Sequence, residues 1–463
     1  MLDITQFKHI HCIGIGGIGL SAIAEILHSQ GYTVSGSDMK KSDVTERLLY
    51  QGITVYQGHA AEHIDGADLI VYSAAVSPEN PEITEARKRD IPVITRAEAL
   101  GSLMSKYGTS IAVSGTHGKT TTTSMVSLIL EKAKMDPTIL IGGNLSEFHG
   151  NAKIGHSKYF VTEACEYMDS FLSLRPKIEI ILNIDSDHLD YFKDIDHIVQ
   201  SFDQFAGLVP EEGLIIAFDS NPFVASIIQK IDSDRIITFG FNPGSTYSAS
   251  DLRFDSNGYP EFNVVKAGEA LAHIHLSIPG EHNIANSLAA FAACHTLGVD
   301  PEDIQSVLDN FHGTQRRFDV IGKTENDVMI IDDYAHHPTE IKATLQAAQK
   351  MPHKRLWCLF QPHTYTRTLA LFDEFAESFN DADILCMAEI FAAREKNIYQ
   401  ISSRKLIHKI RQEQPDKEAY YFHTLKDIAQ FVNDNAMPGD MVITMGAGDI
   451  YKIADMLMNP SES

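Results

Sequence analysis

The sequence has few cysteines and no long apolar run. Five cysteines are scattered over 463 residues, and no two of them form a CxxC pair. An odd number of dispersed cysteines is typical of reduced thiols, so we expect a cytoplasmic protein. The absence of a stretch of about 18 apolar residues predicts that no helix spans a membrane. The N-terminus, MLDITQFKHIHCIGIGG, has no basic leader and runs straight into a predicted strand.

Basic charge is also scarce, because 38 Lys and Arg face 62 Asp and Glu, which gives a formal net charge of −24. Nucleic acids and anionic membranes bind basic faces, so we expect neither as a partner. An anionic ligand must therefore be held by backbone amides and a few placed cations. At roughly 150 residues per domain, the length predicts about three domains.

Strand and helix patterns alternate along the whole chain, which predicts an α/β protein with parallel sheets. One series runs from HIHCIGIG to AEALGSLMSKYG, and a second begins at TSIAVSG and contains a strand-rich patch before GEHNIANSLAAFAACHTLG. A third series follows FHGTQRRFD. We place domain boundaries near residues 108 and 314, which gives domains 1–108, 109–314 and 315–463.

A glycine-rich turn joins the first predicted strand to the first helix. Gly14, Gly16 and Gly19 match the pattern GxGxxG, and Asp38 ends the next strand. This is the dinucleotide-binding fingerprint, in which glycines let the backbone approach a diphosphate at a helix N-terminus. The pattern does not distinguish NAD from another diphosphate such as a UDP-sugar. A tight turn without a ligand is the alternative.

A second loop, SGTHGKTTTT at residues 114–123, also lies between a strand and a helix. It departs from the pattern GxxxxGK[ST], because Val113 takes the place of the first glycine. Amides from Gly115 to Lys119 can still surround phosphates, Lys119 can reach the β and γ oxygens, and Thr120 can bind Mg²⁺. A chance GKT on the surface is the alternative.

Two polar side chains follow later strands of the same series. Glu163 ends KYFVTEA, and His188 lies in NIDSDHLDYF after another strand. Ligands converge on the carboxyl ends of parallel strands, so this carboxylate and imidazole could hold a metal beside a phosphate. A solvated acidic turn is the alternative for the second segment.

Two further segments carry polar groups suited to a nucleotide. His282, Asn283 and Asn286 lie at a helix start, where they could contact a base or cap the helix. Arg316 and Arg317 lie next to the predicted boundary. They could clamp a phosphate and close one domain onto another, or be ordinary surface arginines.

Taken together, these motifs resemble the Mur ligase family over essentially the whole chain. The landmarks occur in the order GIGGIGLSAIAEIL with GSD, SAAVSPENPE, RAEAL, SGTHGKTTTT, EACEYMDSF, NIDSDHLD, GEHNIANSLAA, GTQRRFD, DDYAHHPTEI, FQPHTYTRT and MGAGDI. The resemblance implies an N-terminal Rossmann-like domain for UDP, a central P-loop-type ATPase domain, and a C-terminal Rossmann-like domain that binds the amino acid and closes on ATP.

The implied activity is an ADP-forming ligase of peptidoglycan precursor synthesis. It would join L-alanine to the lactyl carboxylate of UDP-N-acetylmuramate through an acyl phosphate. ATP and Mg²⁺ would be the cofactors, UDP-N-acetylmuramate and L-alanine the substrates, and the protein would be a monomer or a weak homodimer.

The resemblance also implies roles for individual residues. The uridine diphosphate would be contacted by Gly14, Gly16, Gly17, Gly19, Ser37, Asp38, His59 and Ser73. ATP would be contacted by Gly115, Thr116, His117, Gly118, Lys119, Thr120, Thr121, His282, Asn283, Asn286, Arg317 and Asp333. Mg²⁺ would be bound by Thr120, Glu163 and His188. The amino acid and the reacting carboxylate would be faced by Tyr334, His336, His337 and Arg367. The catalytic set would be Lys119, His188, Arg317, Asp333, His336 and Arg367.

The chain departs from the family pattern at two positions. Thr364 stands where several relatives have an arginine, which leaves Arg367 alone in that segment to grip carboxylates. Cys165 replaces an acid, so Glu166 is a candidate rather than an assigned metal ligand. No lysine can be matched to the carbamylated residue that some family members use.

Other functions fit parts of the sequence. A ligase for the murein tripeptide would use the same sugar nucleotide, although its first loop usually differs from GIGGIGLS. Folylpolyglutamate synthase shares the ATP-domain pattern but lacks an N-terminal sheet with this loop. An NAD-dependent oxidoreductase would explain the first loop and Asp38 but not Lys119. A non-catalytic nucleotide-binding regulator would not need the DDYAHHP segment.

Overall fold

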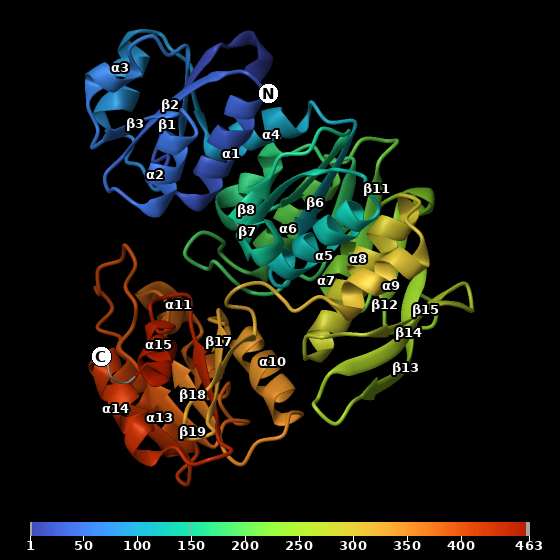
Figure 1. The fold of residues 1–463 in the computed structure, drawn as a ribbon, viewed down its shortest axis with the longest axis vertical. Helices are drawn as coiled ribbons and strands as arrows, with labels where there is room; N and C mark the ends of the chain where they lie inside the picture. The colour runs from blue at the N-terminus through green and yellow to red at the C-terminus, as the bar shows by residue number, and fades with distance from the viewer. Residues whose placement is uncertain (1, 149, 460–463) are drawn as a thin grey trace.

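Three separate sheets with flanking helices form the computed structural model, which describes residues 2–148 and 150–459. Figure 1 shows them as three successive bodies along the chain, the first in blue and the last in orange and red. The predicted three-domain α/β fold is confirmed. Residue 108 lies between the last helix of the first body and the first strand of the second, and residue 314 lies in the link to the third.

The first domain has a five-stranded, fully parallel sheet in the order β3-β2-β1-β4-β5. Its elements are β1 (His9–Ile13), α1 (Ile18–Ser29), β2 (Thr33–Asp38), α2 (Asp43–Tyr50), β3 (Thr54–Gln57), β4 (Leu69–Tyr72), α3 (Pro81–Lys88), β5 (Val93–Thr95) and α4 (Arg96–Met104). The glycine-rich turn lies between the central strand β1 and α1, as the sequence predicts.

The middle domain is built on a ten-stranded sheet in the order β15-β14-β13-β12-β11-β10-β6-β9-β7-β8. Its first half contains β6 (Thr109–Ser114), α5 (Lys119–Lys132), β7 (Thr138–Leu145), β8 (Gly150–Lys153), β9 (Tyr159–Glu163), β10 (Ile178–Ile181) and α6 (Ile195–Ala206). Its second half contains β11 (Leu214–Phe218), α7 (Pro222–Ile228), β12 (Ile236–Gly240), β13 (Tyr247–Phe254), β14 (Pro260–Lys266), β15 (Glu269–His275), α8 (Glu281–Thr296) and α9 (Pro301–Asp309). The strand-rich patch forms the antiparallel extension β13-β14-β15.

The third domain has six strands in the order β16-β17-β21-β18-β19-β20, with only β16 antiparallel to its neighbour. Its elements are β16 (Asp319–Lys323), β17 (Met329–Asp333), α10 (Pro338–Gln349), β18 (Leu356–Phe360), α11 (Tyr365–Ala370), α12 (Phe372–Ala376), β19 (Ile384–Met387), α13 (Ser403–Glu413), β20 (Glu418–Tyr421), α14 (Leu425–Asn435), β21 (Met441–Met445) and α15 (Lys452–Met458).

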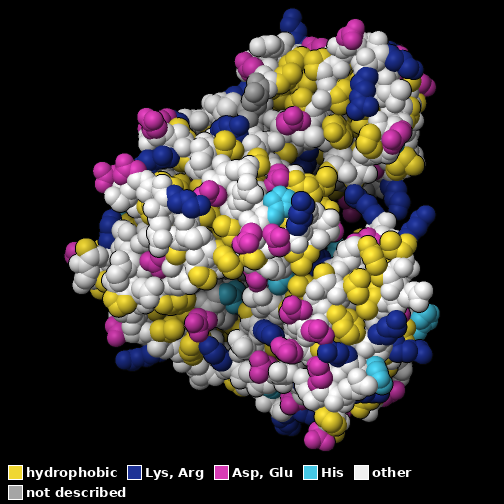
Figure 2. All heavy atoms as spheres, turned by 180° about the vertical axis from the view of Figure 1, so that it is seen from behind, with side chains coloured by type: hydrophobic (Ala, Val, Ile, Leu, Met, Phe, Trp, Pro, Cys, Tyr) yellow, Lys and Arg dark blue, Asp and Glu magenta, His cyan; other side chains and the backbone are white. Residues whose placement is uncertain are grey.

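The central strands are buried on both faces by helices, which is why they read as continuous apolar runs in the sequence. Every residue of β18 and β21 is buried. Across the part of the chain that the structure describes, no helix combines the length and apolarity needed to cross a bilayer. Figure 2 shows acidic and basic side chains interspersed over one face of the molecule. Because the central strands are buried and apolar, the polar side chains described below lie at strand ends and between domains.

Candidate active site

The phosphate loop connects the buried strand β6 to α5 through a backbone that only glycine accommodates easily. Gly115 has φ 137° and Gly118, the N-cap of α5, has φ 85°. A side chain at Gly118 would collide with Asn286, and a Cβ at Gly115 would lie 2.9 Å from that of Leu182. The loop therefore packs tightly on the neighbouring strand end and on α8. Its amides precede the first turn of a helix, which is a favourable place for an anion.

Lys119 extends over this loop and is paired with a carboxylate. Its Nζ donates to Oε2 of Glu166 at 2.8 Å, to the carbonyl oxygen of Gly115 at 2.5 Å and to that of Thr116 at 3.1 Å. Burial alone lowers the pKa of Lys119, but the charge of Glu166 outweighs it and the net shift is upward. The lysine is therefore a fixed cation, and an incoming phosphate would compete with Glu166 for it.

Of the three predicted metal ligands, Thr120 and Glu163 border the same strand, and His188 lies elsewhere. Glu163 accepts from the amide of Gly142 at 2.6 Å, and a Cβ on Gly142 would lie 2.7 Å from its Oε2. A Cβ on Gly143 would lie 3.1 Å from Cγ2 of Thr120. Thr120 and Glu163 thus border the same side-chain-free segment of β7. His188 lies apart from this segment, with its Nε2 3.8 Å from Glu166.

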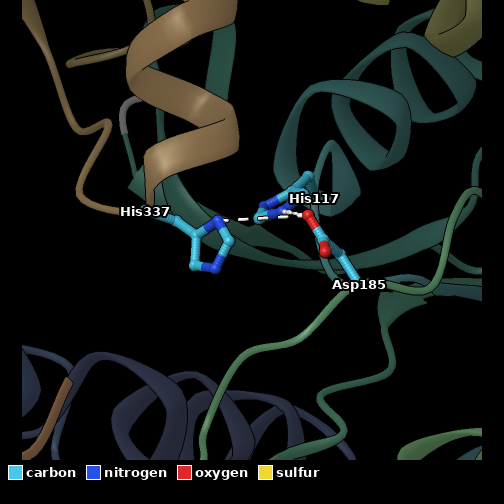
Figure 3. A group of neighbouring side chains, drawn as sticks. All are labelled: His117, Asp185 and His337. Atoms are coloured by element: carbon cyan, nitrogen blue, oxygen red, sulfur yellow. Dashed lines mark hydrogen bonds and ion pairs between the residues drawn. The ribbon is translucent and has the colours of Figure 1, made fainter. Parts of the chain in front are cut away.

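A different trio brings its nitrogen and carboxylate atoms within 4.8 Å of one another: His117, Asp185 and His337. Among the residues described, this is the one such set of three. Figure 3 shows both imidazoles turned toward Asp185, with His337 at the start of α10 and His117 on the phosphate loop. His337 donates from Nε2 to the carbonyl of Ser186 at 2.8 Å, and Thr339 donates to Asp185 at 2.6 Å.

His117 lies between two carboxylates from different domains. Its Nε2 is 3.3 Å from Asp185 of the middle domain, and its Nδ1 is 3.2 Å from Glu340 of the third domain. Burial lowers the pKa of His117, but hydrogen bonds to Asp185 and Glu340 outweigh it and raise the pKa to about 9. A protonated ring has no lone pair for a metal, so the trio acts as a charged contact between domains.

Glu340 connects this contact to residues that the sequence assigned to catalysis. Its carboxylate accepts from the amide of His336 at 3.1 Å and lies 4.0 Å from Nη1 of Arg317. His336 donates from Nδ1 toward the carbonyl of Tyr334 at 3.0 Å. Burial lowers the pKa of His336 to about 3, so this ring is neutral near pH 7. One carboxylate thus holds the phosphate loop, Arg317 and His336 together.

Arg367 makes a second contact between domains. Its Nε and Nη2 both lie 3.0 Å from Oδ1 of Asp187 in the middle domain. This arginine is therefore already paired with a carboxylate at the place where the sequence predicts a substrate carboxylate. Arg316 has a different role, because it pairs with Asp332 at 3.0 Å and donates to the carbonyl of Gly446 at 2.7 Å. Arg316 stabilises the third domain internally.

A cavity of about 850 Å³ opens between the middle and third domains. Sequence-predicted nucleotide residues line it: His117, Gly118, Thr121, His282, Asn283, Asn286, Arg317 and Asp333. Phe218, Phe239 and Phe241, from the ends of β11 and β12, add an apolar wall that the sequence analysis missed. The volume suits a nucleotide-sized ligand, and the mixed wall suits a base and its phosphates.

Asp333 serves the local fold as well as the cavity. Its carboxylate accepts from the amides of Phe318 at 2.8 Å and Ala335 at 2.6 Å. Burial raises the pKa of Asp333 to about 6. The carboxylate thereby fixes the backbone directly after Arg317 and directly after Tyr334.

In the first domain the glycine-rich turn is completed by Asp38 and Ser73. Oδ2 of Asp38 accepts from the amide of Gly16 at 2.9 Å, and a Cβ on Gly14 would lie 3.3 Å from that of Ser73. Arg96, which the sequence analysis missed, reaches the start of α1, since a Cβ on Gly19 would lie 3.0 Å from its Nη1. A guanidinium at this helix start favours a diphosphate there.

Ser37 and His59, also predicted to contact the uridine diphosphate, lie together at the carboxyl edge of this sheet. The hydroxyl of Ser37 is fully buried and lies 3.0 Å from Nδ1 of His59. The side chain of His59 is 15% exposed. His59 can therefore contact a ligand directly, whereas Ser37 is buried beneath His59.

Family models match the chain in three consecutive segments. These are the Mur ligase family catalytic domain at residues 9–108, the Mur ligase middle domain at residues 113–294, and the Mur ligase glutamate ligase domain at residues 316–448. The segments coincide with the three sheets.

Curated relatives match over their full length. A UDP-N-acetylmuramate–L-alanine ligase from Acetivibrio thermocellus is 49% identical over 463 residues, which is 100% of this chain and 98% of the relative. A protein of the same name from Alkaliphilus metalliredigens is 50% identical, with 99% and 98% covered.

Solved structures agree with this fold. A UDP-N-acetylmuramate–alanine ligase from Thermotoga maritima superimposes with a TM-score of 0.81 at 28% identity, covering 98% of this chain and 99% of that one. A murein peptide ligase from Psychrobacter arcticus gives a TM-score of 0.71 at 27% identity, with 98% of each chain covered.

The charged contact at His117 predicts a pH-dependent link between the domains. The folded pKa of His117, about 9, lies above the ordinary value of 6.5. The contact should therefore be fully present below about pH 6.5 and be lost as the pH rises through about 9. Replacing Glu340 by Gln should lower the pKa of His117 by about one unit or more, because an opposite charge beside the ring is lost. NMR titration of the histidine rings, with His117→Gln to assign the resonance, measures this shift.

A matched control is Glu374→Gln, which removes a carboxylate from the same domain away from this contact. It should leave the titration of His117 unchanged. An unchanged pKa for His117 in the Glu340→Gln protein would show that the two side chains do not interact in solution.

Proposed function

The chain belongs to the Mur ligase family, and we propose that it joins L-alanine to the lactyl carboxylate of UDP-N-acetylmuramate in peptidoglycan precursor synthesis, with ATP converted to ADP and phosphate. The observation that carries the proposal is the cavity between the middle and third domains beside the phosphate loop. Full-length identity to ligases of that name supports the choice of substrates.

ATP is the nucleotide that this cavity suits. In the proposal the base and ribose lie among Phe218, Phe241, Asn283 and the start of α8, and the phosphates extend toward Lys119. Lys119 then exchanges Glu166 for a phosphate oxygen. A preorganised cation of this kind usually gives the largest electrostatic contribution to phosphoryl transfer.

The residues beside the loop also fit Mg²⁺. The hydroxyl of Thr120 and the carboxylate of Glu163 are oxygen donors, which Mg²⁺ prefers, and both border a segment where a Cβ would fill the space. When bound, Mg²⁺ would neutralise phosphate charge and polarise the transferred group. His188 and Glu166, whose Nε2 and Oε1 lie 3.8 Å apart, remain candidate ligands.

The chain's own residues supply positioning for both chemical steps. The lactyl carboxylate attacks the γ-phosphate and forms an acyl phosphate, and the amine of alanine then displaces phosphate to form the amide. His336 donates from Nδ1 to Tyr334, so its Nε2 lone pair is free to accept a hydrogen bond from the amine. Arg367 is placed to exchange Asp187 for a substrate carboxylate.

The first domain holds the uridine diphosphate part of the sugar nucleotide in this proposal. The glycine-rich turn, the start of α1 and Arg96 favour the diphosphate, and Asp38, His59 and the strand ends beside them face the nucleoside. A reaction that uses ATP and a nucleotide sugar, in a chain with five free cysteines, supports a cytoplasmic location in this proposal. We take it to be a monomer or a weak homodimer.

Phosphate release from ATP tests the substrate choice. With UDP-N-acetylmuramate present, L-alanine should give the fastest release, glycine and L-serine slower release, and the murein tripeptide none above background. Omitting the sugar nucleotide should abolish release with every amino acid. Faster release with the tripeptide would replace this proposal with the murein peptide ligase reaction.

Lys119→Ala tests the phosphate loop within this function. The change removes the cation that faces the transferred phosphoryl group, so turnover should fall by at least about 10³-fold. Lys132→Ala, at the other end of α5 and exposed, is the matched control and should retain turnover within about twofold. A Lys119→Ala enzyme within tenfold of the wild type would reject the assigned role of the loop.

A further inference from the structure

We infer that Glu82 is a positioning residue that fixes the tautomer of His59, so that His59 accepts a hydrogen bond from a donor group of the uridine. The inference rests on the proposed binding of the sugar nucleotide to the first domain. It adds Glu82, the last residue of the landmark SAAVSPENPE, to which the sequence reading gave no role in ligand binding.

Glu82 lies inside the first domain at the second residue of α3. Its side chain is fully buried. Oε2 accepts from the hydroxyl of Ser37 at 2.6 Å, and Oε1 accepts from Nδ1 of His63 at 2.9 Å and from the amide of Ala60 at 3.2 Å. A carboxylate from α3 thus connects the ends of β2 and β3. In the sheet, these two strands lie on one side of β1, and β4 and β5, the strands that α3 connects, lie on the other.

The carboxylate is ionised and can only accept. Burial alone raises the pKa of Glu82, but the imidazole of His11 and the donors Ser37 and His63 outweigh burial and bring the pKa to about 2. Nε2 of His11 lies 3.5 Å from Oε2, while its Nδ1 lies 2.8 Å from the hydroxyl of Ser35. An ionised carboxylate has no proton to donate.

Because Glu82 can only accept, it sets the donor and acceptor roles in the hydrogen bond between Ser37 and His59. A hydroxyl has one proton, and in Ser37 that proton points at Glu82. Oγ of Ser37 can then only accept from Nδ1 of His59, which lies 3.0 Å away. A neutral His59 therefore carries its proton on Nδ1 and leaves a lone pair on Nε2.

The position of His59 in the sheet indicates which ligand group its Nε2 lone pair would contact. His59 follows β3 by two residues, at the same sheet edge as Asp38 and the glycine-rich turn. In this type of sheet, ligands bind beyond the carboxyl ends of the strands, with the diphosphate at the turn and the ribose near the acid that ends β2. Tyr56 stacks on His63 with centroids 4.4 Å apart beside this edge. The nucleoside would lie next to His59, where the uracil imino group or a ribose hydroxyl is the donor.

Two measurements on the full chain test the inference. The first is the tautomer of His59 in ¹⁵N-histidine-labelled protein at pH 8, assigned with His59→Phe, because the two ring nitrogens have distinct shifts. The proton should be on Nδ1 in the wild type. A proton on Nε2 would overturn the inference without reference to any substrate.

The second measurement compares UDP affinity between Glu82→Gln and the wild type by calorimetry. The glutamine amide can donate to Ser37 and reverse the chain of hydrogen bonds, so UDP affinity should fall about tenfold or more, the size expected for one well-placed hydrogen bond. ATP affinity should stay within about twofold, which also shows that the variant is folded. Glu85→Gln, on the same helix but paired with Arg89 at the surface, should bind UDP as the wild type does.

Two UDP analogues identify the donor in the wild type. Methylation of the uracil N3 or removal of the ribose 2′-hydroxyl should weaken binding, and the analogue that does so names the group that His59 contacts. If neither analogue weakens binding, or if Glu82→Gln binds UDP as tightly as the wild type, the inference is wrong while the proposed function stands. A wild type that binds no UDP would overturn both.

Discussion

The phosphate loop is joined to the third domain by one imidazolium, His117, whose side chain is 16% exposed. His117 lies between Asp185 of its own domain and Glu340 of α10, and Glu340 in turn holds Arg317 and His336. His117, Asp185 and Glu340 also line the cavity between the two domains. A neutral histidine or a missing carboxylate would leave a buried charge without a partner, which is costly at a domain interface.

Each cation in the site is already balanced by a carboxylate of the chain. Lys119 faces Glu166, His117 faces Glu340, and Arg367 faces Asp187. In a chain with a net charge of −24, this pairing confines positive potential to a few positions. An anionic ligand can take the place of these carboxylates where its own geometry matches. The two nucleotide loops differ in this pairing of lysine with carboxylate. The glycine-rich turn contains no lysine, and Asp38 there accepts from the amide of Gly16.

The sequence was informative wherever the relevant residues are adjacent in the chain. Strand and helix patterns predicted three α/β domains, and contiguous motifs located both loops, because a turn between a strand and a helix is a local feature. Glu340, Asp187 and Glu82 were missed as site residues because their partners lie far away in sequence. Glu340 is 223 residues from His117, and Asp187 is 180 residues from Arg367. Arg96 begins the landmark RAEAL, which the sequence reading matched without giving Arg96 a role. The aromatic wall of the cavity has no motif beyond ordinary strand patterns.

The path of one oxygen atom tests the proposed chemistry most directly. UDP-N-acetylmuramate labelled with heavy oxygen in its lactyl carboxylate should transfer one labelled oxygen to the released phosphate, with ADP as the nucleotide product. This follows because the carboxylate oxygen that attacks the γ-phosphate leaves with it when the amine forms the amide. Phosphate without label, or AMP with pyrophosphate as products, would contradict the acyl-phosphate route.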